Sequence, residues 1–281
     1  MAVKCGDYVV RRSYREDIVF RIKQIFRDEN DVSAAVLNGV EVRLIADSPL
    51  EDLCPAEYHE KERVMVAADL FSRLKSGERR ASSESKEGGS FDYPGMVLHL
   101  DGDKEYLEKS VEGYEKLGIP HVGLAVPERD QADAVPYYLQ RYRPEILVLT
   151  GHDSLLKNAA DRRNLDHYRT SFYFVEAVRR ARQYQPDRDA LIIFAGACQS
   201  CYEELIRAGA NYASSPRRVF IHVCDPVLLV ERLAFTSIKE VLTVEEAVAA
   251  TAGGAGAIGG IETRGCFRRG YPRIDEKVIG V

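Results

Sequence analysis

Cys198 and His152 are the two residues of this sequence whose chemistry and positions fit one another best. Each follows an apolar run of strand length: EILVLT leads into Gly151-His152-Asp153, and ALIIF leads into AGACQS. Because the carboxyl ends of successive parallel strands meet at one edge of a sheet, the thiol and the imidazole are expected side by side. A thiolate that attacks a carbonyl, with an imidazole that moves the proton, performs nucleophilic acyl transfer. The pattern predicts a cysteine peptidase with Cys198 as the nucleophile and His152 as its acid–base partner.

The residues around Cys198 also favour a reactive thiol. The segment CYEELIRAG predicts a helix, and either its N-terminus or a neighbouring imidazolium would favour the thiolate. Ala195, Gly196 and Ala197 are small, which leaves room for a substrate backbone. Cys198 follows His152 by 46 residues, close to the spacing of about 50 residues in the caspase signature, although only Ala-Cys-Gln of that motif is present. A strand ending in His, followed one strand later by a strand ending in Ala-Cys, resembles the caspase, gingipain and clostripain group as a whole.

Cys201 gives the main alternative to a peptidase. Cys198-Gln-Ser-Cys201 is a C-x-x-C motif, which is typical of a redox pair or of half a zinc site, with His222 and Cys224 as the other two ligands. His222 and Cys224 fall in an apolar run that predicts a buried strand, and the chain has no tryptophan beside the motif. We therefore expect Cys201 to be a small residue in the first turn of the helix after the nucleophile, and we expect no metal ion and no cofactor.

Five acidic residues are candidates for the substrate and oxyanion site: Asp101, Asp103, Asp153, Asp225 and Glu262. The four aspartates each follow an apolar run, so they are expected at the same sheet edge as Cys198. A peptidase that cuts after Arg or Lys needs a carboxylate to pair with that side chain, and Asp225 is the favoured residue. Alternatively, both Asp225 and Asp103 are N-caps: Asp225 caps the helix that follows it, and Asp103 caps the helix expected over residues 104–118. Glu262 lies in GGIETRG, which is expected to shape the substrate groove.

Beyond residue 94, apolar runs alternate with helical segments. The runs MVLHL, HVGLAV, EILVLTG, ALIIFAG and RVFIHV predict strands. This alternation is typical of α/β proteins and predicts an open, doubly wound, mainly parallel sheet flanked by helices over residues 94–281. The glycines between residues 253 and 260 form neither G-x-x-x-x-G-K-[ST] nor a strand-turn G-x-G-x-x-G. Neither type of nucleotide-binding loop is therefore expected.

The N-terminal part of the chain has a different pattern. Residues 1–53 contain short strands separated by polar turns, which predict a small β-barrel resembling SH3 or Tudor folds. Asn38-Gly39 predicts a two-residue hairpin turn, since both residues would take positive φ. Residues 54–93 predict a helix and then a flexible charged linker, SGERRASSESKEGGS. Arg79 and Arg80 in this linker are candidate self-processing sites, because proteolysis concentrates in exposed linkers.

Composition favours a soluble cytoplasmic protein. The 281 residues are 45% hydrophobic and 30% charged, and 44 acidic against 39 basic residues give a net charge of −5. This balance provides no overall attraction to nucleic acid or to anionic membranes. The N-terminus MAVKCGDYVV lacks the apolar core of a signal peptide, and no window approaches about 18 consecutive apolar residues. The six cysteines are expected to be reduced thiols, and the expected partners are protein substrates rather than nucleic acid or membranes.

Several long blocks resemble a single family: LHLDGD (98–103), RPEILVLTGHD (143–153), IIFAGACQS (192–200), LIRAGANYASSPRRV (205–219) and GGIETRG (259–265). Together with GDYVVRRSY and VEVRLIAD near the N-terminus, they are similar to the YabG family of sporulation-specific proteases from spore-forming Firmicutes. The resemblance implies a cysteine endopeptidase that cleaves spore coat and related spore proteins after basic residues. It implies Cys198 as the nucleophile, His152 as the general base, and a location in the mother-cell cytoplasm or with the spore coat.

The residue order around His152 departs from the caspase-type groups. Many of these have a glycine directly after the histidine, and its backbone N–H helps to form the oxyanion hole. Here Gly151 precedes His152 and Asp153 follows it; the Cys198 N–H can still donate to an oxyanion, but the second donor stays open. Two other functions also stay open: a thiol–disulfide or zinc protein built on Cys198 and Cys201, and a non-enzymatic coat-assembly scaffold whose N-terminal barrel binds a partner.

Overall fold

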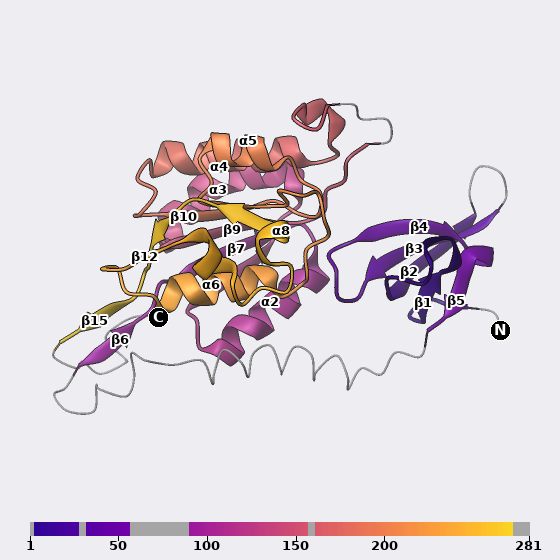
Figure 1. The fold of residues 1–281 in the computed structure, drawn as a ribbon, viewed down its shortest axis with the longest axis horizontal. Helices are drawn as coiled ribbons and strands as arrows, with labels where there is room; N and C mark the ends of the chain where they lie inside the picture. The colour runs from indigo at the N-terminus through magenta and orange to yellow at the C-terminus, as the bar shows by residue number, and fades with distance from the viewer. Residues whose placement is uncertain (1–2, 28–31, 57–89, 157–160, 272–281) are drawn as a thin grey trace. The chain divides into compact units, whose positions relative to one another are not determined.

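The chain divides into two compact units, residues 1–68 and residues 69–281. The computed structural model describes residues 3–27, 32–56, 90–156 and 161–271, and its elements are labelled in Figure 1. Most of the segment that the sequence predicts as a helix and linker, with Arg79 and Arg80, lies outside the described residues. Within the described ranges, no helix has the length and apolar character needed to cross a membrane.

The first unit is an antiparallel sheet of short strands. The strands are β1 (Tyr8–Arg11), β2 (Phe20–Arg27), β3 (Ser33–Gly39), β4 (Ile45–Pro49) and β5 (Leu53–Pro55), in the order β4-β3-β2-β1-β5. Alternate residues such as Phe20 and Ile22 point into a small apolar core with Val9 and Leu37, as expected for a sheet with one buried face. The antiparallel sheet is compatible with the SH3-like or Tudor-like barrel, which stays a prediction.

The turn predicted at Asn38-Gly39 is wrong. Both residues lie within β3, where Asn38 pairs with Ile45 of β4, and neither has a positive φ. The chain reverses over residues 40–44 instead. A Cβ on Gly39 would lie 2.4 Å from the carbonyl oxygen of Val42. Glycine is therefore needed here for the close approach of the loop and not for a left-handed turn.

The second unit contains a mainly parallel sheet, as the sequence predicts. Its strands are β7 (Val97–Asp101), β8 (His121–Ala125), β9 (Ile146–Thr150), β10 (Ile192–Ala195), β11 (Tyr212–Ser214) and β13 (Ile258–Gly260), in the order β13-β11-β10-β9-β7-β8. All neighbouring pairs are parallel except β11 with β13. Strands β7, β9 and β10 are fully buried, because helices cover both faces of the sheet.

Helices lie on the two faces of this sheet. Figure 1 shows α3 (Glu128–Tyr142), α4 (Ser171–Tyr184) and α5 (Tyr202–Ala208) over one face, and α2 (Lys104–Leu117) and α6 (Asp225–Phe235) over the other. The first group packs on the larger apolar core through side chains such as Leu139, Phe174 and Leu205. Short elements complete the unit: β6 (Phe91–Tyr93), η3 (Leu165–His167), β12 (Val241–Leu242), α7 (Val244–Val248), α8 (Gly254–Ala257), β14 (Thr263–Arg264) and β15 (Arg268–Gly270).

The strand predicted at RVFIHV, residues 218–223, is wrong. The sheet continues after α5 with β11, whose Tyr212 pairs with Phe194 of β10. Residues 218–223 take no part in that sheet; they pass beside the nucleophile candidate, where the Ile221 N–H donates to the Cys198 sulfur at 3.2 Å. Ile221 is 1% exposed, so its apolar character reflects burial beside the Cys198 loop rather than a place in the sheet.

Candidate active site

The register of β9 and β10 makes the His152 and Cys198 segments leave the sheet from neighbouring strand ends. Leu149 and Ala195 are Cα partners in these parallel neighbours, and His152 and Cys198 each lie three residues beyond that pair. Adjacent strands are about 4.8 Å apart. The thiol and the imidazole therefore start from neighbouring positions at the carboxyl edge, where open α/β sheets place their sites.

The His152 ring is paired with a carboxylate. Its Nε2 lies 2.9 Å from Asp103 Oδ2, and the Asp103 side chain is 5% exposed. The Tyr106 ring meets the imidazole edge to face, with centroids 5.4 Å apart. The other ring nitrogen, Nδ1, is buried and has no hydrogen-bond partner among the described residues. The carboxylate and the tyrosine ring together fix the orientation of the imidazole.

Asp103 also caps helix α2. Its Oδ1 accepts the backbone N–H groups of Glu105 at 2.8 Å and Tyr106 at 3.4 Å. This confirms the capping alternative for Asp103. Two neighbouring oxygens of one carboxyl group thus anchor the start of α2 and the ring of His152.

A buried polar network lies behind Asp103. Asp101 is fully buried; its Oδ1 accepts the Asp103 N–H at 2.9 Å, and its Oδ2 accepts the Thr150 hydroxyl at 2.8 Å. His99 Nε2 lies 2.6 Å from Thr150 Oγ1, and His99 Nδ1 lies 3.1 Å from the Tyr114 hydroxyl. Asp101 therefore holds the strand end that carries Asp103, in a position that is closed to solvent.

Asp153 joins the segment after His152 to the segment after Cys198. Its Oδ1 accepts the N–H groups of Ser154 at 2.8 Å and Thr170 at 2.9 Å, and its Oδ2 accepts the Ser200 hydroxyl at 2.9 Å and the Ser171 hydroxyl. Burial raises the pKa of the Asp153 carboxyl, against these hydrogen bonds, which lower it. Asp153 is 6% exposed, so it holds the segment after His152 and the segment after Cys198 together from a buried position.

The loop that carries Cys198 is held on both sides. Ser200 Oγ accepts the Ala197 N–H at 2.9 Å, and Ser214 Oγ donates to the Ala197 carbonyl at 2.9 Å. Gly196 has φ +108°, and a Cβ there would lie 2.5 Å from Ser214 Oγ, so only glycine fits. The Cys198 side chain is 1% exposed, with the Ile221 N–H directed at its sulfur. A backbone donor in this position stabilises a negative sulfur.

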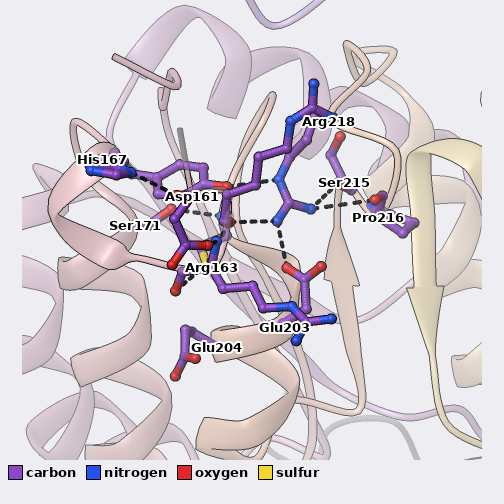
Figure 2. Close-up of polar contacts among 12 residues, drawn as sticks. Asp161, Arg163, His167, Ser171, Glu203, Glu204, Ser215, Pro216 and Arg218 are labelled. Carbon is purple, nitrogen blue, oxygen red and sulfur yellow. Dashed lines mark hydrogen bonds and ion pairs between the residues drawn. The ribbon is translucent and has the colours of Figure 1, made fainter. Parts of the chain in front are cut away.

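Arg218 ties together the segments around this loop (Figure 2). Its guanidinium donates to Glu203 of α5, to the Arg162 carbonyl at 3.0 Å, to the Ser215 carbonyl at 3.1 Å and to the Tyr168 hydroxyl at 2.8 Å. The Arg218 side chain is 7% exposed. The helix after Cys198, the loop after His152 and the segment that leads to Ile221 therefore share one buried cation.

Cys201 is the N-cap residue of α5 and is fully buried. Its N–H donates to Ser171 Oγ at 2.8 Å, and its sulfur faces the carbonyls of Arg162 and Arg163 at 3.7 and 3.8 Å. Burial raises the pKa of the Cys201 thiol, which disfavours the thiolate that redox chemistry and metal binding need. In the described parts of the chain, no three His, Cys, Asp or Glu side chains gather into a group that could hold a metal ion.

The remaining two acidic candidates are Asp225 and Glu262, and they lie in different parts of the second unit. Asp225 begins α6, is fully buried, and accepts the N–H groups of Ala252 at 2.7 Å and His222 at 3.2 Å; burial raises its pKa. Glu262 is exposed and follows β13, which runs antiparallel and ends opposite Tyr212, the first residue of β11. Glu262 therefore lies at the amino edge of the sheet, away from Cys198.

Glu128 contacts the site and was missed by the sequence reasoning. Its Oε1 accepts the His152 backbone N–H at 2.7 Å. The one available signal was an acidic residue at the start of the helix after β8, next in the sheet to β7. Acidic residues are common at helix N-termini for electrostatic reasons alone, so that signal could not be distinguished from the ordinary preference.

The fold and this polar edge are those of an α/β enzyme domain with its site at the carboxyl ends of the strands. Comparison with known proteins gives the family. The family described as YabG peptidase U57 matches residues 4–272. The chain is also 42% identical over 286 residues to the sporulation-specific protease YabG of Bacillus subtilis (strain 168), across 97% of this chain and 99% of that protein. The chain belongs to the YabG peptidase family, which confirms the resemblance drawn from its sequence blocks, and it is a peptidase.

Proposed function

We propose that this sporulation protease is a cysteine endopeptidase in which Cys198, His152 and Asp103 act together. The observation that carries the proposal is the His152–Asp103 pair, 2.9 Å between ring nitrogen and carboxylate, beside the strand end that leads to Cys198. A carboxylate on one ring nitrogen fixes the tautomer and orientation of the imidazole and stabilises the imidazolium. The buried Nδ1 is then the nitrogen that exchanges a proton with the thiol.

The proposed reaction proceeds through an acyl-enzyme. His152 Nδ1 takes the proton of the Cys198 thiol, and the thiolate attacks the peptide carbonyl carbon. The tetrahedral intermediate collapses when the imidazolium gives its proton to the leaving amine, which breaks the C–N bond and leaves a thioester on Cys198. A water molecule, deprotonated by His152, then attacks the thioester; the new acid leaves and the thiol is regenerated.

The oxyanion of the intermediate needs backbone donors. We assign one to the Cys198 N–H. The His152 N–H is directed at Glu128, so it is not the second donor.

For substrates, we propose spore coat and related spore proteins in the mother cell, cut after Arg or Lys. Asp225 is the proposed acid for the basic side chain. It lies four residues beyond Ile221, whose N–H meets the Cys198 sulfur, and a bound cation would offset the cost of its buried charge. Replacement of Asp225 by Asn is expected to lower cleavage after Arg more than cleavage after uncharged residues.

Cleavage mapping tests the proposal directly. Wild type incubated with a library of peptides that contain basic residues, followed by mass spectrometry, is expected to show cuts on the carboxyl side of Arg or Lys. Cys198→Ala and His152→Ala are expected to show none, while Cys5→Ser, at an exposed thiol of the first unit, cleaves as wild type does. Proteolysis that persists in Cys198→Ala would overturn the assignment.

We also propose self-processing in the linker between residues 75 and 87, with Arg79 and Arg80 as candidate sites. The support is its basic, Ser- and Gly-rich sequence, since these residues lie outside the described ranges. Wild type is expected to lose mass on prolonged incubation, whereas Cys198→Ala stays intact. Equal intact masses for the two proteins after incubation would refute self-processing without touching the assignment of the nucleophile.

A further inference from the structure

Two glycines lie side by side where β7 and β9 end. Asp101 and Thr150 are Cα partners in these strands, and each is followed by a glycine, Gly102 and Gly151. The Gly102 N–H donates to the Thr150 carbonyl at 3.0 Å, which keeps the two strand ends together beyond the last sheet pair. Neither glycine has a positive φ, so backbone conformation does not explain their presence.

The Glu128 side chain occupies the space that both glycines leave. A Cβ on Gly102 would lie 2.3 Å from the Glu128 carboxyl carbon, and a Cβ on Gly151 would lie 2.3 Å from Glu128 Oε1. Such distances are far below contact, so any side chain at either position would displace the carboxylate. Glycine is present here for close approach, and what approaches is the first residue of α3.

The space beside Gly102 and Gly151, called the glycine slot below, is filled by the Glu128 carboxylate, which holds the main chain of His152. Glu128 Oε1 accepts the His152 N–H at 2.7 Å, a charge-assisted hydrogen bond. On the other side of the residue, the Thr170 hydroxyl donates to the His152 carbonyl. The ring of His152 is bound by Asp103, so separate groups fix its ring and its backbone.

We propose that Glu128 is a positioning residue for His152, and that Gly102 and Gly151 exist to admit its carboxylate. The proposal rests on the proposed cysteine-peptidase function and deepens it. It also gives a reason for the glycine that directly precedes His152. Gly151 makes room for Glu128, and the N–H of His152 itself is used to place the histidine.

Kinetics of conservative and truncating variants test this role. Glu128→Ala removes the acceptor and is expected to lower kcat about 10- to 100-fold, since small misplacements of catalytic groups have effects of that size, with KM within about threefold. Glu128→Gln keeps a carbonyl oxygen for the His152 N–H and is expected to retain most of kcat. Equal losses in Gln and Ala variants, or a kcat for Glu128→Ala within about threefold of wild type, would contradict the proposal. Asp130→Ala, an exposed acid in the same first turn of α3, is the matched control and is expected to match wild type.

The glycine slot gives a second test. Gly151→Ala is expected to expel the carboxylate and to lose kcat to the same degree as Glu128→Ala. In the double variant the clash is gone, so kcat is expected to be no lower than in Glu128→Ala alone, which is strong non-additivity. Fully additive losses in the double variant would show that Gly151 acts independently of Glu128 and would refute the slot.

A measurement without substrate separates this proposal from the function itself. Isotope-labelled histidine gives one backbone amide signal for each of the six histidines, and His152→Gln identifies the signal of His152. That signal is expected to move in Glu128→Ala and to stay unchanged in Asp130→Ala, even if no peptide were cleaved. An unmoved signal in Glu128→Ala would overturn the positioning role. If wild type cleaved no peptide, the proposed function would be wrong instead.

Discussion

The carboxyl group of Asp103 joins His152, 49 residues further along the chain, to the first turn of α2. Its Oδ2 lies 2.9 Å from His152 Nε2, and its Oδ1 accepts the N–H groups of Glu105 and Tyr106. An N-cap aspartate is normally explained by helix stability alone. Here the cap also sets the ring of the proposed general base, so helix stability and catalysis meet in one side chain.

Substitutions at Asp103 are expected to separate these two roles. Asp103→Ser keeps a good N-cap but cannot offer a carboxylate to His152. Its free energy of unfolding is expected to stay within about 0.5 kcal/mol of wild type, while kcat falls by about two to four orders of magnitude. Asp103→Ala is expected to lose kcat and also about 1 kcal/mol of stability. Urea denaturation and peptide hydrolysis measure the two effects, and a fully active Asp103→Ser would exclude Asp103 from the mechanism.

Asp153 is expected to make stability depend on pH. Burial raises the pKa of its carboxyl above the ordinary value of 3.8, so between the two pKa values the folded state binds more protons than the unfolded state. Its contribution to the free energy of unfolding is therefore fully present below about pH 3.8 and is lost as the pH rises through the folded-state pKa.

The comparison of wild type with Asp153→Asn measures this contribution, because the variant cannot titrate at residue 153. The stability of wild type relative to the variant is expected to fall from acid toward neutral pH and then level off, as followed by urea denaturation at a series of pH values. Asp130→Asn controls for the loss of an exposed aspartate. A difference that rises with pH would show that the pKa of Asp153 is lowered instead.

Arg218 is expected to matter for stability far more than its neighbour Arg217. Arg218→Met leaves Glu203 and the Arg162 carbonyl without their buried donor, which is expected to cost about 2–3 kcal/mol. Arg217 is exposed, and Arg217→Met is expected to change stability by less than about 0.5 kcal/mol. Chemical denaturation of both variants tests this, and similar values for the two would mean that the contacts drawn in Figure 2 contribute little.

Cys201→Ser is expected to retain hydrolytic activity. Burial raises the pKa of the Cys201 thiol, and its sulfur faces the carbonyls of Arg162 and Arg163. No step of the proposed reaction uses this thiol. Labelling with an electrophilic peptide that ends in Arg is expected to modify Cys198 and not Cys201, as located by mass spectrometry. Loss of activity in Cys201→Ser equal to that in Cys198→Ser would favour the redox or zinc alternative.

Local pattern alone predicted the parts of this protein that depend on neighbouring residues. The alternation of apolar runs and helical segments gave the parallel sheet, and strand ends gave the positions of His152 and Cys198. The cap at Asp103 could also be read from sequence, because a cap concerns only the next three residues. The strand prediction for RVFIHV was wrong for the complementary reason. Apolar residues indicate burial, and Ile221 is buried beside the Cys198 loop instead of between strand partners.

The contacts that complete the candidate site were decided by tertiary structure. Strand order places β7 between β8 and β9, and this order alone puts Asp103 beside His152 and lets Glu128 enter between Gly102 and Gly151. The same holds for Asp153 with Ser200, which join segments 47 residues apart. Sequence determined which residues stand at the carboxyl edge, because periodicity is local. Which of them touch was set by the order in which the strands pair, and no local pattern encodes that order.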